Sequence, residues 1–342
     1  MQTKTQMARE IAEIPKAAAR LLKEGHAARS DAAASARSKG PAFLITVARG
    51  SSDHAATYLK YASELLLGLP VASVGPSIAS IYGARLKLSQ ALALTISQSG
   101  QSPDIVTMTK SAAHDGAFSL ALTNDPASPL AQNADMTLAL HAGPELSVAA
   151  TKTFVNSVIA GLAFLAEWAQ DEALLTALET LPEHLLTAVN FDWPELRHAL
   201  EGHNSLFTIG RGPAWAIAGE AALKLKETCQ LHGEAYSSAE VLHGPVSIVG
   251  KDFPVLAFGV DDTAERGLVE IADRIEALGA QVFVTSKLAK DARRLEHVRT
   301  GHPLLDPLAL IVSFYAMVER LAAARGINPD MPRHLKKVTQ TR

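Results

Sequence analysis

"ALALTISQSGQSPDIVTMTK", residues 91–110, contains the change of pattern that decides the fold. Residues 91–97 form a short apolar run, which predicts a buried β-strand. Residues 104–116 carry apolar side chains at helical spacing. Residues 97–102, where the two patterns meet, comprise three serines, two glutamines and one glycine, more polar residues than a turn between a strand and a helix requires. We therefore expect a strand, a hydroxyl-rich loop and a helix, in that order.

The end of this loop has the pattern of a helix start. Ser102 suits the N-cap, Pro103 the first helical position and Asp104 the first turn. Free N–H groups and the positive end of the helix dipole favour an anion there, serine hydroxyls add donors, and Gly100 permits close approach. The loop has no lysine, so it is not a Walker-type nucleotide loop. We expect a phosphate site; the alternative is a turn that only caps the helix.

The same alternation of strands and helices extends on both sides of this stretch. Strands are predicted over residues 41–48, 117–123 and 135–143, and helices over residues 54–68 and 152–170. Strands that are apolar throughout indicate a parallel sheet with both faces covered. The first half of the chain is therefore expected to form an α/β domain.

The pattern then restarts in the second half of the chain. "FLITVARGSSDH" (43–54) has a counterpart in "SLFTIGRGPAWA" (205–216), which begins 162 residues later. "GAFSLALT" (116–123) has one in "GAQVFVTS" (279–286), which begins 163 residues later. A nearly constant offset indicates two copies of one α/β domain. The polar, proline-containing region 181–204 is interpreted as a linker with short helices.

Composition and charge exclude several classes of protein. The 342 residues are 48% hydrophobic and 20% charged, with a formal net charge of −3, which favours a soluble globular protein without a nucleic-acid partner. The only cysteine, Cys229, cannot form an internal disulfide, so a cytoplasmic location is expected. The longest apolar run, residues 307–318, is shorter than the ~20 residues that cross a bilayer. The N-terminus lacks a signal-peptide core, so no membrane partner is expected.

The histidines and cysteine show no metal-binding pattern. There is no HExxH motif among the twelve histidines and no CxxC motif, so no metal is expected.

Two further segments follow predicted strands. "GSSDH" (50–54) is most simply a helix start capped by Ser51 or Ser52. "ELSVAATKTF" (145–154) has small residues that permit close approach of a ligand, although ordinary packing explains them equally well.

The second copy differs from the first where the phosphate loop would be. "GVDDTA" (259–264) replaces "SQSGQS", and its two carboxylates would repel a phosphate. The second copy offers instead a helix on which Glu220, Lys224 and Glu227 stand at i, i+4 and i+7, on one face. Apolar neighbours indicate that this stripe is buried, with shifted pKa values. A solvent-facing row of salt bridges is the alternative.

Two basic features have no function that the residues alone reveal. His243 lies in the loop "LHGP" and is most simply polar surface. Lys336 and Lys337 lie in the last segment, 329–342, which is typical of a solvated basic end.

In combination, these motifs resemble a known family. The order "ISQSGQSPD", "SVAATK", "TIGRG", "ALKLKE", "EVLHGP" and a terminal "PRHLKKVT" is similar to the paired sugar isomerase (SIS) domains of glucosamine-6-phosphate synthase. "ARGSSDHA", "SSAEVLHGPV" and "GINPDMPRHLKKVTQT" are closer to the second type of glucosamine-6-phosphate deaminase. The resemblance extends from about residue 40 to residue 342.

The resemblance implies an α/β fold of two tandem SIS domains, each a parallel β-sheet flanked by helices in three layers. The expected parts are an N-terminal helical segment (1–38), a phosphate-binding SIS domain (39–180), a linker (181–200), a second SIS domain with the acid and base residues (201–328) and a C-terminal tail that closes the active site (329–342).

The resemblance also implies which residues bind the substrate. The positions that match the family's phosphate loop are Ser97, Gln98, Ser99 and Ser102. Ser52 and the segment from Val148 to Ala150 match its sugar contacts.

Four further positions match the family's catalytic residues. Glu227 would move a proton between C1 and C2 of the sugar, and Lys224 would assist proton transfer at a sugar oxygen. His243 would promote ring opening from the neighbouring subunit, which implies a homodimer. Lys337, rather than Lys336, would lie near the open-chain carbonyl carbon. A buried carboxylate and a histidine suit this acid–base chemistry.

This sequence departs from the synthase pattern at two points, and these differences limit the reactions that the resemblance implies. Ala150 replaces a serine, and no N-terminal nucleophilic cysteine for glutamine hydrolysis is present. Without a nitrogen supply, the resemblance implies deamination: D-glucosamine 6-phosphate and water give D-fructose 6-phosphate and ammonia, with no cofactor. The alternatives are another phosphosugar aldose–ketose isomerase, a fructosamine-6-phosphate deglycase and a phosphosugar-sensing regulator. The regulator is disfavoured because no basic recognition helix precedes the first strand.

Overall fold

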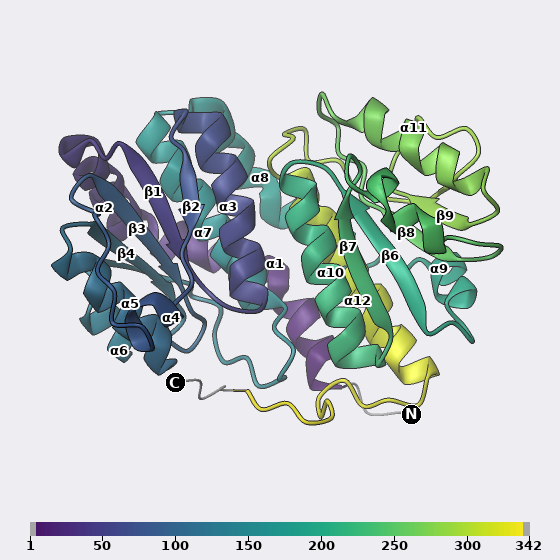
Figure 1. Ribbon diagram of the computed structural model, residues 1–342, viewed down its shortest axis with the longest axis horizontal. Helices are drawn as coiled ribbons and strands as arrows, with labels where there is room; N and C mark the ends of the chain where they lie inside the picture. The colour runs from purple at the N-terminus through teal and green to yellow at the C-terminus, as the bar shows by residue number, and fades with distance from the viewer. Residues whose placement is uncertain (1–4, 338–342) are drawn as a thin grey trace. The chain divides into compact units, whose positions relative to one another are not determined.

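The computed structural model describes residues 5–337 and divides the chain into two compact units (Figure 1). We call them the first-sheet unit and the second-sheet unit, after the sheet that each contains. The first-sheet unit comprises residues 14–145, 152–182 and the C-terminal residues from 336. The second-sheet unit comprises the N-terminal residues up to 13, residues 146–151 and residues 183–335.

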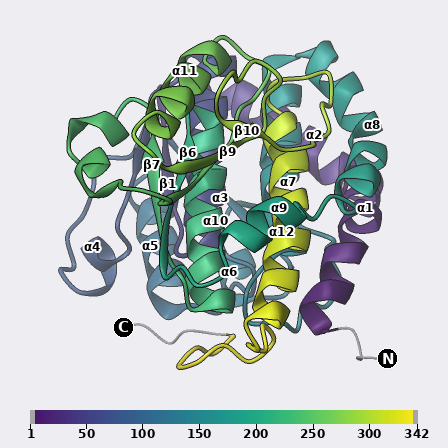
Figure 2. The same cartoon turned by 90° about the vertical axis from the view of Figure 1, so that its right-hand side faces the viewer.

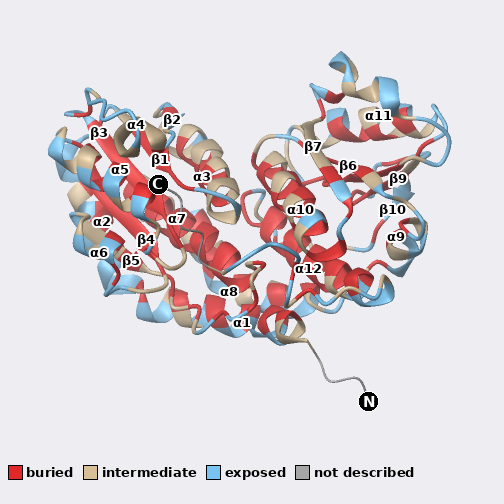
Figure 3. Ribbon diagram, turned by 60° about the horizontal axis from the view of Figure 1, so that its bottom comes forward, coloured by how far each residue is buried: buried red, intermediate tan, exposed pale blue. Residues whose placement is uncertain are grey.

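The first-sheet unit is built on five parallel strands in the order β2-β1-β3-β4-β5. The strands are β1 (Phe43–Val47), β2 (Val71–Ser73), β3 (Ala91–Ile96), β4 (Phe118–Thr123) and β5 (Met136–Ala139). Every residue of β3 and β4 is buried (Figure 3). Since neighbouring residues of a strand point to opposite faces, helices must cover both faces, as the apolar runs predicted.

Two groups of helices provide this cover. They are α2 (His26–Lys39), α3 (Ser51–Leu67) and α7 (Lys152–Ala169) in one group, and α4 (Ser77–Ser80), α5 (Pro103–His114) and α6 (Pro129–Gln132) in the other. Ile45 and Ala93 pack with Ile105 and Met108 of α5 in one core cluster. Their strand neighbours Leu44 and Leu92, which point the other way, are equally buried.

The second-sheet unit repeats this topology. Its strands β6 (Ser205–Gly210), β7 (His232–Ser237), β8 (Pro254–Ala257), β9 (Gln281–Val284) and β10 (Arg293–Arg294) are parallel, in the order β7-β6-β8-β9-β10. Its helices are α9 (Pro194–Ala199), α10 (Pro213–Cys229), α11 (Glu265–Glu276), α12 (Asp306–Ala324) and the 3₁₀ turns η1 (Val241–His243) and η2 (Pro245–Ile248). Two parallel five-stranded sheets with one strand order explain the sequence repeat.

The two units also share a backbone conformation in the turn that follows β1 in one unit and β6 in the other. Gly50 has φ 57° and ψ −134°, and Gly212 has φ 55° and ψ −133°. Both are N-caps, and only glycine adopts this conformation easily. The prediction that Ser51 or Ser52 caps α3 was therefore wrong, because both residues lie inside the helix.

Two helices contain residues of both units. α1 (Gln6–Glu24) and α8 (Glu172–Ala188) each pass from one unit into the other. α8 continues through Pro182, so the region from residue 181 begins in a helix. Leu178, Leu181 and Leu185 are buried at helical spacing, and their burial outweighs the backbone hydrogen bond lost at the proline.

α12 passes a length and composition test for a membrane-spanning helix. It has 19 residues, and 78% of its apolar window is buried inside the protein. The apolar run 307–318 lies within this helix, which continues past the run to Ala324. Its burial, rather than its length, identifies α12 as a core helix.

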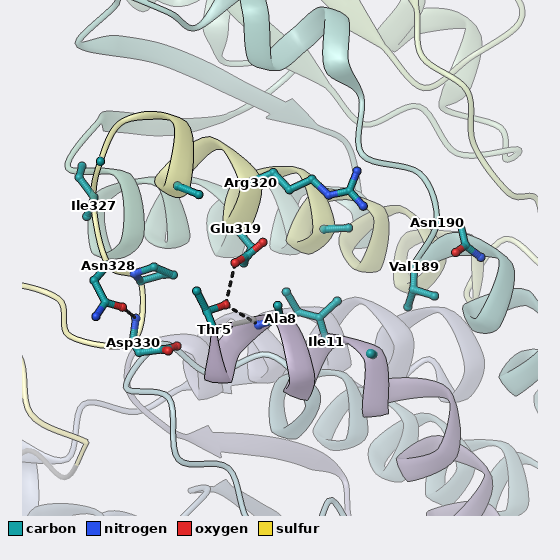
Figure 4. A pocket seen from close by; sticks show the side chains of 15 residues that line it. Thr5, Ala8, Ile11, Val189, Asn190, Glu319, Arg320, Ile327, Asn328 and Asp330 are labelled. Carbon is teal, nitrogen blue, oxygen red and sulfur yellow. Dashed lines mark hydrogen bonds between the residues drawn. The ribbon is translucent and has the colours of Figure 1, made fainter. Parts of the chain in front are cut away.

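The start of α1 is held by residues distant in sequence. Asp330 accepts hydrogen bonds from the amides of Gln6 (2.7 Å) and Met7 (2.8 Å). Thr5 Oγ1 accepts one from the amide of Ala8 (3.0 Å) and donates to Glu319 of α12 (2.6 Å; Figure 4). The first-turn N–H groups, which have no partners inside a helix, are thereby satisfied. A cleft of about 900 Å³ beside them contains none of the predicted site residues.

Replacing Asp330 with alanine should loosen the first turn of α1. The change removes an acceptor from two amides and a negative charge from a helix N-terminus, so we expect a loss of about 1–3 kcal/mol in unfolding free energy. Denaturant unfolding and hydrogen exchange at residues 6–8 measure the effect. Asp31→Ala, at an exposed position of α2, is the control. Equal stability and exchange in both variants would contradict the assignment.

Candidate functional site

The predicted phosphate loop lies at the topological switch point of the first sheet. β1 and β3 are neighbours, with Val47 opposite Thr95, and the chain turns to opposite sides of the sheet after them. Parallel strands end at one edge, and ligands bind in the crevice at such a point. Ser52 at the start of α3 and the loop from Ser97 to Ser102 therefore share this edge.

The backbone of this loop is held by its own hydroxyl groups and a tight contact. Ser97 Oγ accepts a hydrogen bond from the amide of Gly100 (3.2 Å), and Ser99 Oγ accepts one from the amide of Gln101 (3.3 Å). Gly100 has φ 61°, and a Cβ there would lie 2.2 Å from Ser128 Oγ. The carbonyl oxygen of Gln98 accepts from the amide of Asn124 (3.0 Å). Three hydrogen bonds and this close contact hold the backbone of the loop from Ser97 to Ser102, which we call the cradle.

Ser102 occupies the N-cap position of α5, as predicted, but its side chain makes no capping hydrogen bond. The amide of Ile105, which an N-cap side chain would normally bind, is bonded to Asp104 Oδ1 (2.9 Å). Capping the helix therefore does not explain the Ser102 hydroxyl, which disfavours the reading of this loop as a plain cap.

Sequence reasoning missed a cation beside the cradle. Arg49 Nη2 lies 2.5 Å from Asp104 Oδ2 in the first turn of α5, and its side chain is half-exposed. Burial raises the pKa of Asp53, and the positive charge of Arg49 partly offsets this rise. The available signal was the Arg-Gly pair that recurs in the two copies, as Arg49-Gly50 and Arg211-Gly212. The cradle is lysine-free but has a cation next to it.

The stripe on α10 is buried, and the solvent-facing alternative was wrong. Glu220 and Lys224 are 0% exposed, whereas the side chain of Glu227 retains 20%. Lys224 Nζ lies 3.4 Å from Glu220 Oε1 and also donates a hydrogen bond to Glu227 Oε2. We call these three residues the α10 array. Glu227 is its most accessible member.

The charges of the α10 array determine the ionisation of its lysine. Burial alone would lower the pKa of Lys224, but the carboxylates of Glu220 and Glu227 outweigh this effect and raise its pKa above the usual value. Lys224 is therefore an ammonium group at neutral pH. It can donate a proton or hydrogen bond while stabilising the Glu227 carboxylate.

The segment that contains Val148 and Ala150 is anchored by α1. Glu10 is fully buried and accepts hydrogen bonds from the amides of Leu146 (2.5 Å) and Ser147 (3.3 Å). Val148 and Ala150, the two predicted sugar contacts, are half-buried. No local pattern identifies Glu10 as their support, because the contact joins residues 136 positions apart.

The tail lysine has a carboxylate partner in the first-sheet unit. Lys337 Nζ lies 3.1 Å from Glu145 Oε2, and Glu145 is buried and also accepts from the Thr153 amide (3.1 Å). Lys336 is exposed. No local pattern marks Glu145 as the partner of Lys337, because the two residues are 192 positions apart.

His243 is the predicted site residue with the least support within its own unit. It is exposed at the end of η1, where its amide bonds to the carbonyl oxygen of Glu240 (2.9 Å). The structure thus groups Ser52 with the cradle, Lys337 with Glu145, and Lys224 with Glu227, each within one unit. It leaves His243 on a separate exposed turn.

In the second-sheet unit, the protein's own ion pairs occupy the strand ends that correspond to the cradle. Arg299 Nη2 lies 2.8 Å from Glu265 Oε1, and Arg299 Nη1 lies 3.2 Å from Asp306 Oδ2. Burial raises the pKa of Asp262 in the corresponding loop. That the second copy binds no phosphate there stays a prediction. Between residues 5 and 337, no cluster of three metal-ligating side chains was found.

Residues 43–167 match the SIS domain. The glutamine–fructose-6-phosphate aminotransferases of Symbiobacterium thermophilum and Sulfolobus acidocaldarius are 34% and 30% identical, over 86% and 88% of this chain. The chain spans about half the length of these curated relatives, 51% and 50%.

Solved structures extend the match over nearly the whole chain. A protein from Silicibacter pomeroyi, assigned only provisionally as a phosphosugar isomerase, is 62% identical with a TM-score of 0.93, covering 96% of this chain and 100% of its own. The C-terminal domain of the Francisella tularensis glucosamine–fructose-6-phosphate aminotransferase has the same fold, with a TM-score of 0.87 at 24% identity over 97% of this chain and 99% of that one. The chain belongs to the SIS domain family of phosphosugar isomerases.

Proposed function

We propose that this chain is a glucosamine-6-phosphate deaminase, which converts D-glucosamine 6-phosphate and water to D-fructose 6-phosphate and ammonia. The observation that carries the proposal is the α10 array, in which a buried ammonium group supports one accessible carboxylate. A carboxylate supported in this way suits removal of a carbon-bound proton next to a carbonyl group. The hydroxyl-rich cradle supports a phosphorylated substrate.

The thiol of Cys229 does not suit the release of ammonia from glutamine. Releasing ammonia from an amide with a thiol nucleophile needs an accessible thiolate. Cys229, the only cysteine in the sequence, is fully buried, and burial raises its pKa to about 11. Water as co-substrate requires no such group.

In the proposed reaction, the opened sugar presents an aldehyde at C1 and an amino group at C2. Glu227 takes the proton from C2 while Lys224 hydrogen-bonds or protonates the C1 oxygen, which gives an enolamine. Return of the proton from Glu227 to C1 gives an imine at C2. Water adds to this imine, the C–N bond breaks, and ammonia leaves as the ketone of fructose 6-phosphate forms.

The remaining predicted residues complete this proposal. The loop residues Ser97, Gln98, Ser99 and Ser102 hold the phosphate, and Ser52, Val148 and Ala150 contact the sugar. His243 promotes ring opening from a neighbouring subunit of a homodimer; its exposure supports this role. Lys337 acts near the carbonyl carbon.

Purified full-length protein should release ammonia from D-glucosamine 6-phosphate, measured by a coupled ammonia assay together with fructose 6-phosphate. Unphosphorylated glucosamine should react poorly, because it cannot use the cradle. Fructosyl-lysine 6-phosphate should yield no lysine. Absence of ammonia from glucosamine 6-phosphate would reject the deaminase, and lysine release or interconversion of other sugar phosphates would favour the deglycase or isomerase alternative.

Glu227→Gln should lower kcat by a factor of about 10² to 10⁴, the usual contribution of a positioned general base, while keeping substrate binding. His243→Ala should lower turnover through slower ring opening. Mixed heterodimers of the two variants should recover part of the activity, since one site then has both residues intact. Inactive heterodimers of verified composition would place both residues in a site within one chain.

Gly100→Ala should raise KM for the phosphorylated substrate at least about tenfold, with a smaller effect on kcat. The added Cβ would lie 2.2 Å from Ser128 Oγ, so the cradle must shift. Gly40→Ala is the matched control, because Gly40 also has a positive φ (55°) but has no atom within 4 Å of a Cβ. Similar KM values for the two variants would argue against the cradle as the phosphate site.

A further inference from the structure

A buried tyrosine from another helix is connected to the α10 array. Tyr315 of α12 is 0% exposed, and its hydroxyl donates a hydrogen bond to Glu220 Oε1 over 2.9 Å. α10 and α12 lie side by side in both views of the second-sheet unit (Figures 1 and 2). The two residues are 95 positions apart, so sequence spacing does not reveal the contact.

The tyrosine hydroxyl and Lys224 both stabilise the same carboxylate. Glu220 is fully buried, and a buried carboxylate needs charged or hydrogen-bonding partners to remain ionised. Lys224 must serve two carboxylates, at 3.4 Å from Glu220 and in direct contact with Glu227. Glu220 and Glu227 compete for the ammonium group of Lys224. The hydrogen bond from Tyr315 to Glu220 reduces this competition in favour of Glu227.

We propose that Tyr315 is a positioning residue: by holding Glu220, it keeps Lys224 directed at Glu227. The inference deepens the proposed function and rests on its assignment of Glu227 as the base. Tyr315 acts through Glu220 and Lys224, and it does not touch the substrate in this scheme.

Other ionisable side chains near the α10 array can also affect its charges, and they come from the elements that pack against α10. β6, β7 and α12 pack against α10. β6 has no ionisable side chain; the ionisable residues of the other two elements are His232, Glu234 and Tyr236 on β7, and Asp306, Tyr315, Glu319 and Arg320 on α12. Three of these have partners away from the array: Asp306 pairs with Arg299, Glu319 accepts from Thr5, and Arg320 pairs with Asp192.

Loss of the Tyr315 hydroxyl should shift the pH–rate profile in one direction. Glu220 without Tyr315 draws Lys224 toward itself, and Glu227 loses part of its ammonium partner. A carboxylate with less positive charge beside it has a higher pKa. The acid limb of the pH–rate profile should therefore move to higher pH, and less of the base form is present at a given pH below neutrality.

The test is Tyr315→Phe in the full-length protein, with the pH dependence of kcat for ammonia release as the readout. We expect the acid limb to move to higher pH by about 0.5 to 1 unit, so that kcat at a pH below the midpoint of the limb falls about three- to tenfold, with KM nearly unchanged. Ser313→Ala is the matched control, because it also removes a buried hydroxyl from α12, one that bonds to the carbonyl oxygens of Ala188 and Ala309. Its profile should stay that of the wild type.

A second measurement requires no substrate. In protein labelled with ¹³C at the glutamate carboxyl carbon, the Glu227 signal, assigned by its loss in Glu227→Gln, should titrate at a higher pH in Tyr315→Phe than in the wild type. An unchanged Glu227 titration and an unchanged profile, with only a lower melting temperature, would overturn the inference. A wild type that releases no ammonia would reject the proposed function, and the titration would still decide the role of Tyr315.

Discussion

A lysine buried between two glutamates is the interaction on which the second-sheet unit depends. Removing three charges from water costs several kcal/mol per ion unless each is paired, so Glu220, Lys224 and Glu227 must keep one arrangement. α10 supplies all three residues at the spacing that aligns them, and α12 supplies Tyr315. The partly exposed Glu227 is therefore held by a rigid, charged interior.

The two units share one sheet topology but carry different side chains at the strand ends. In the first, the switch point between β1 and β3 carries open hydroxyl groups and a helix start. In the second, Arg299 and its carboxylate partners fill the corresponding strand ends, and the α10 array lies along the face of a helix. Under the proposed function, the divergence of the two loops corresponds to a division between binding the phosphate and moving the proton.

Local patterns predicted the parts of this structure that local forces determine. The apolar runs predicted the parallel strands, the repeat predicted the second sheet, and the spacing of Glu220, Lys224 and Glu227 predicted their shared face. Contacts between distant segments were missed: Tyr315 with Glu220, Glu10 with the 146–147 amides, and Lys337 with Glu145. The cap at Gly50 was missed because serine is the usual N-cap, whereas this turn needs a positive φ.

The central claim is that one carboxylate, held by the α10 array, moves a proton from C2 to C1. The most direct measurement uses glucosamine 6-phosphate with deuterium at C2 and mass spectrometry of the fructose 6-phosphate formed. The account predicts loss of deuterium from C2 in every turnover, with part of it recovered at C1. Ammonia release without deuterium at C1, in single turnovers too fast for exchange with solvent, would contradict transfer by a single base.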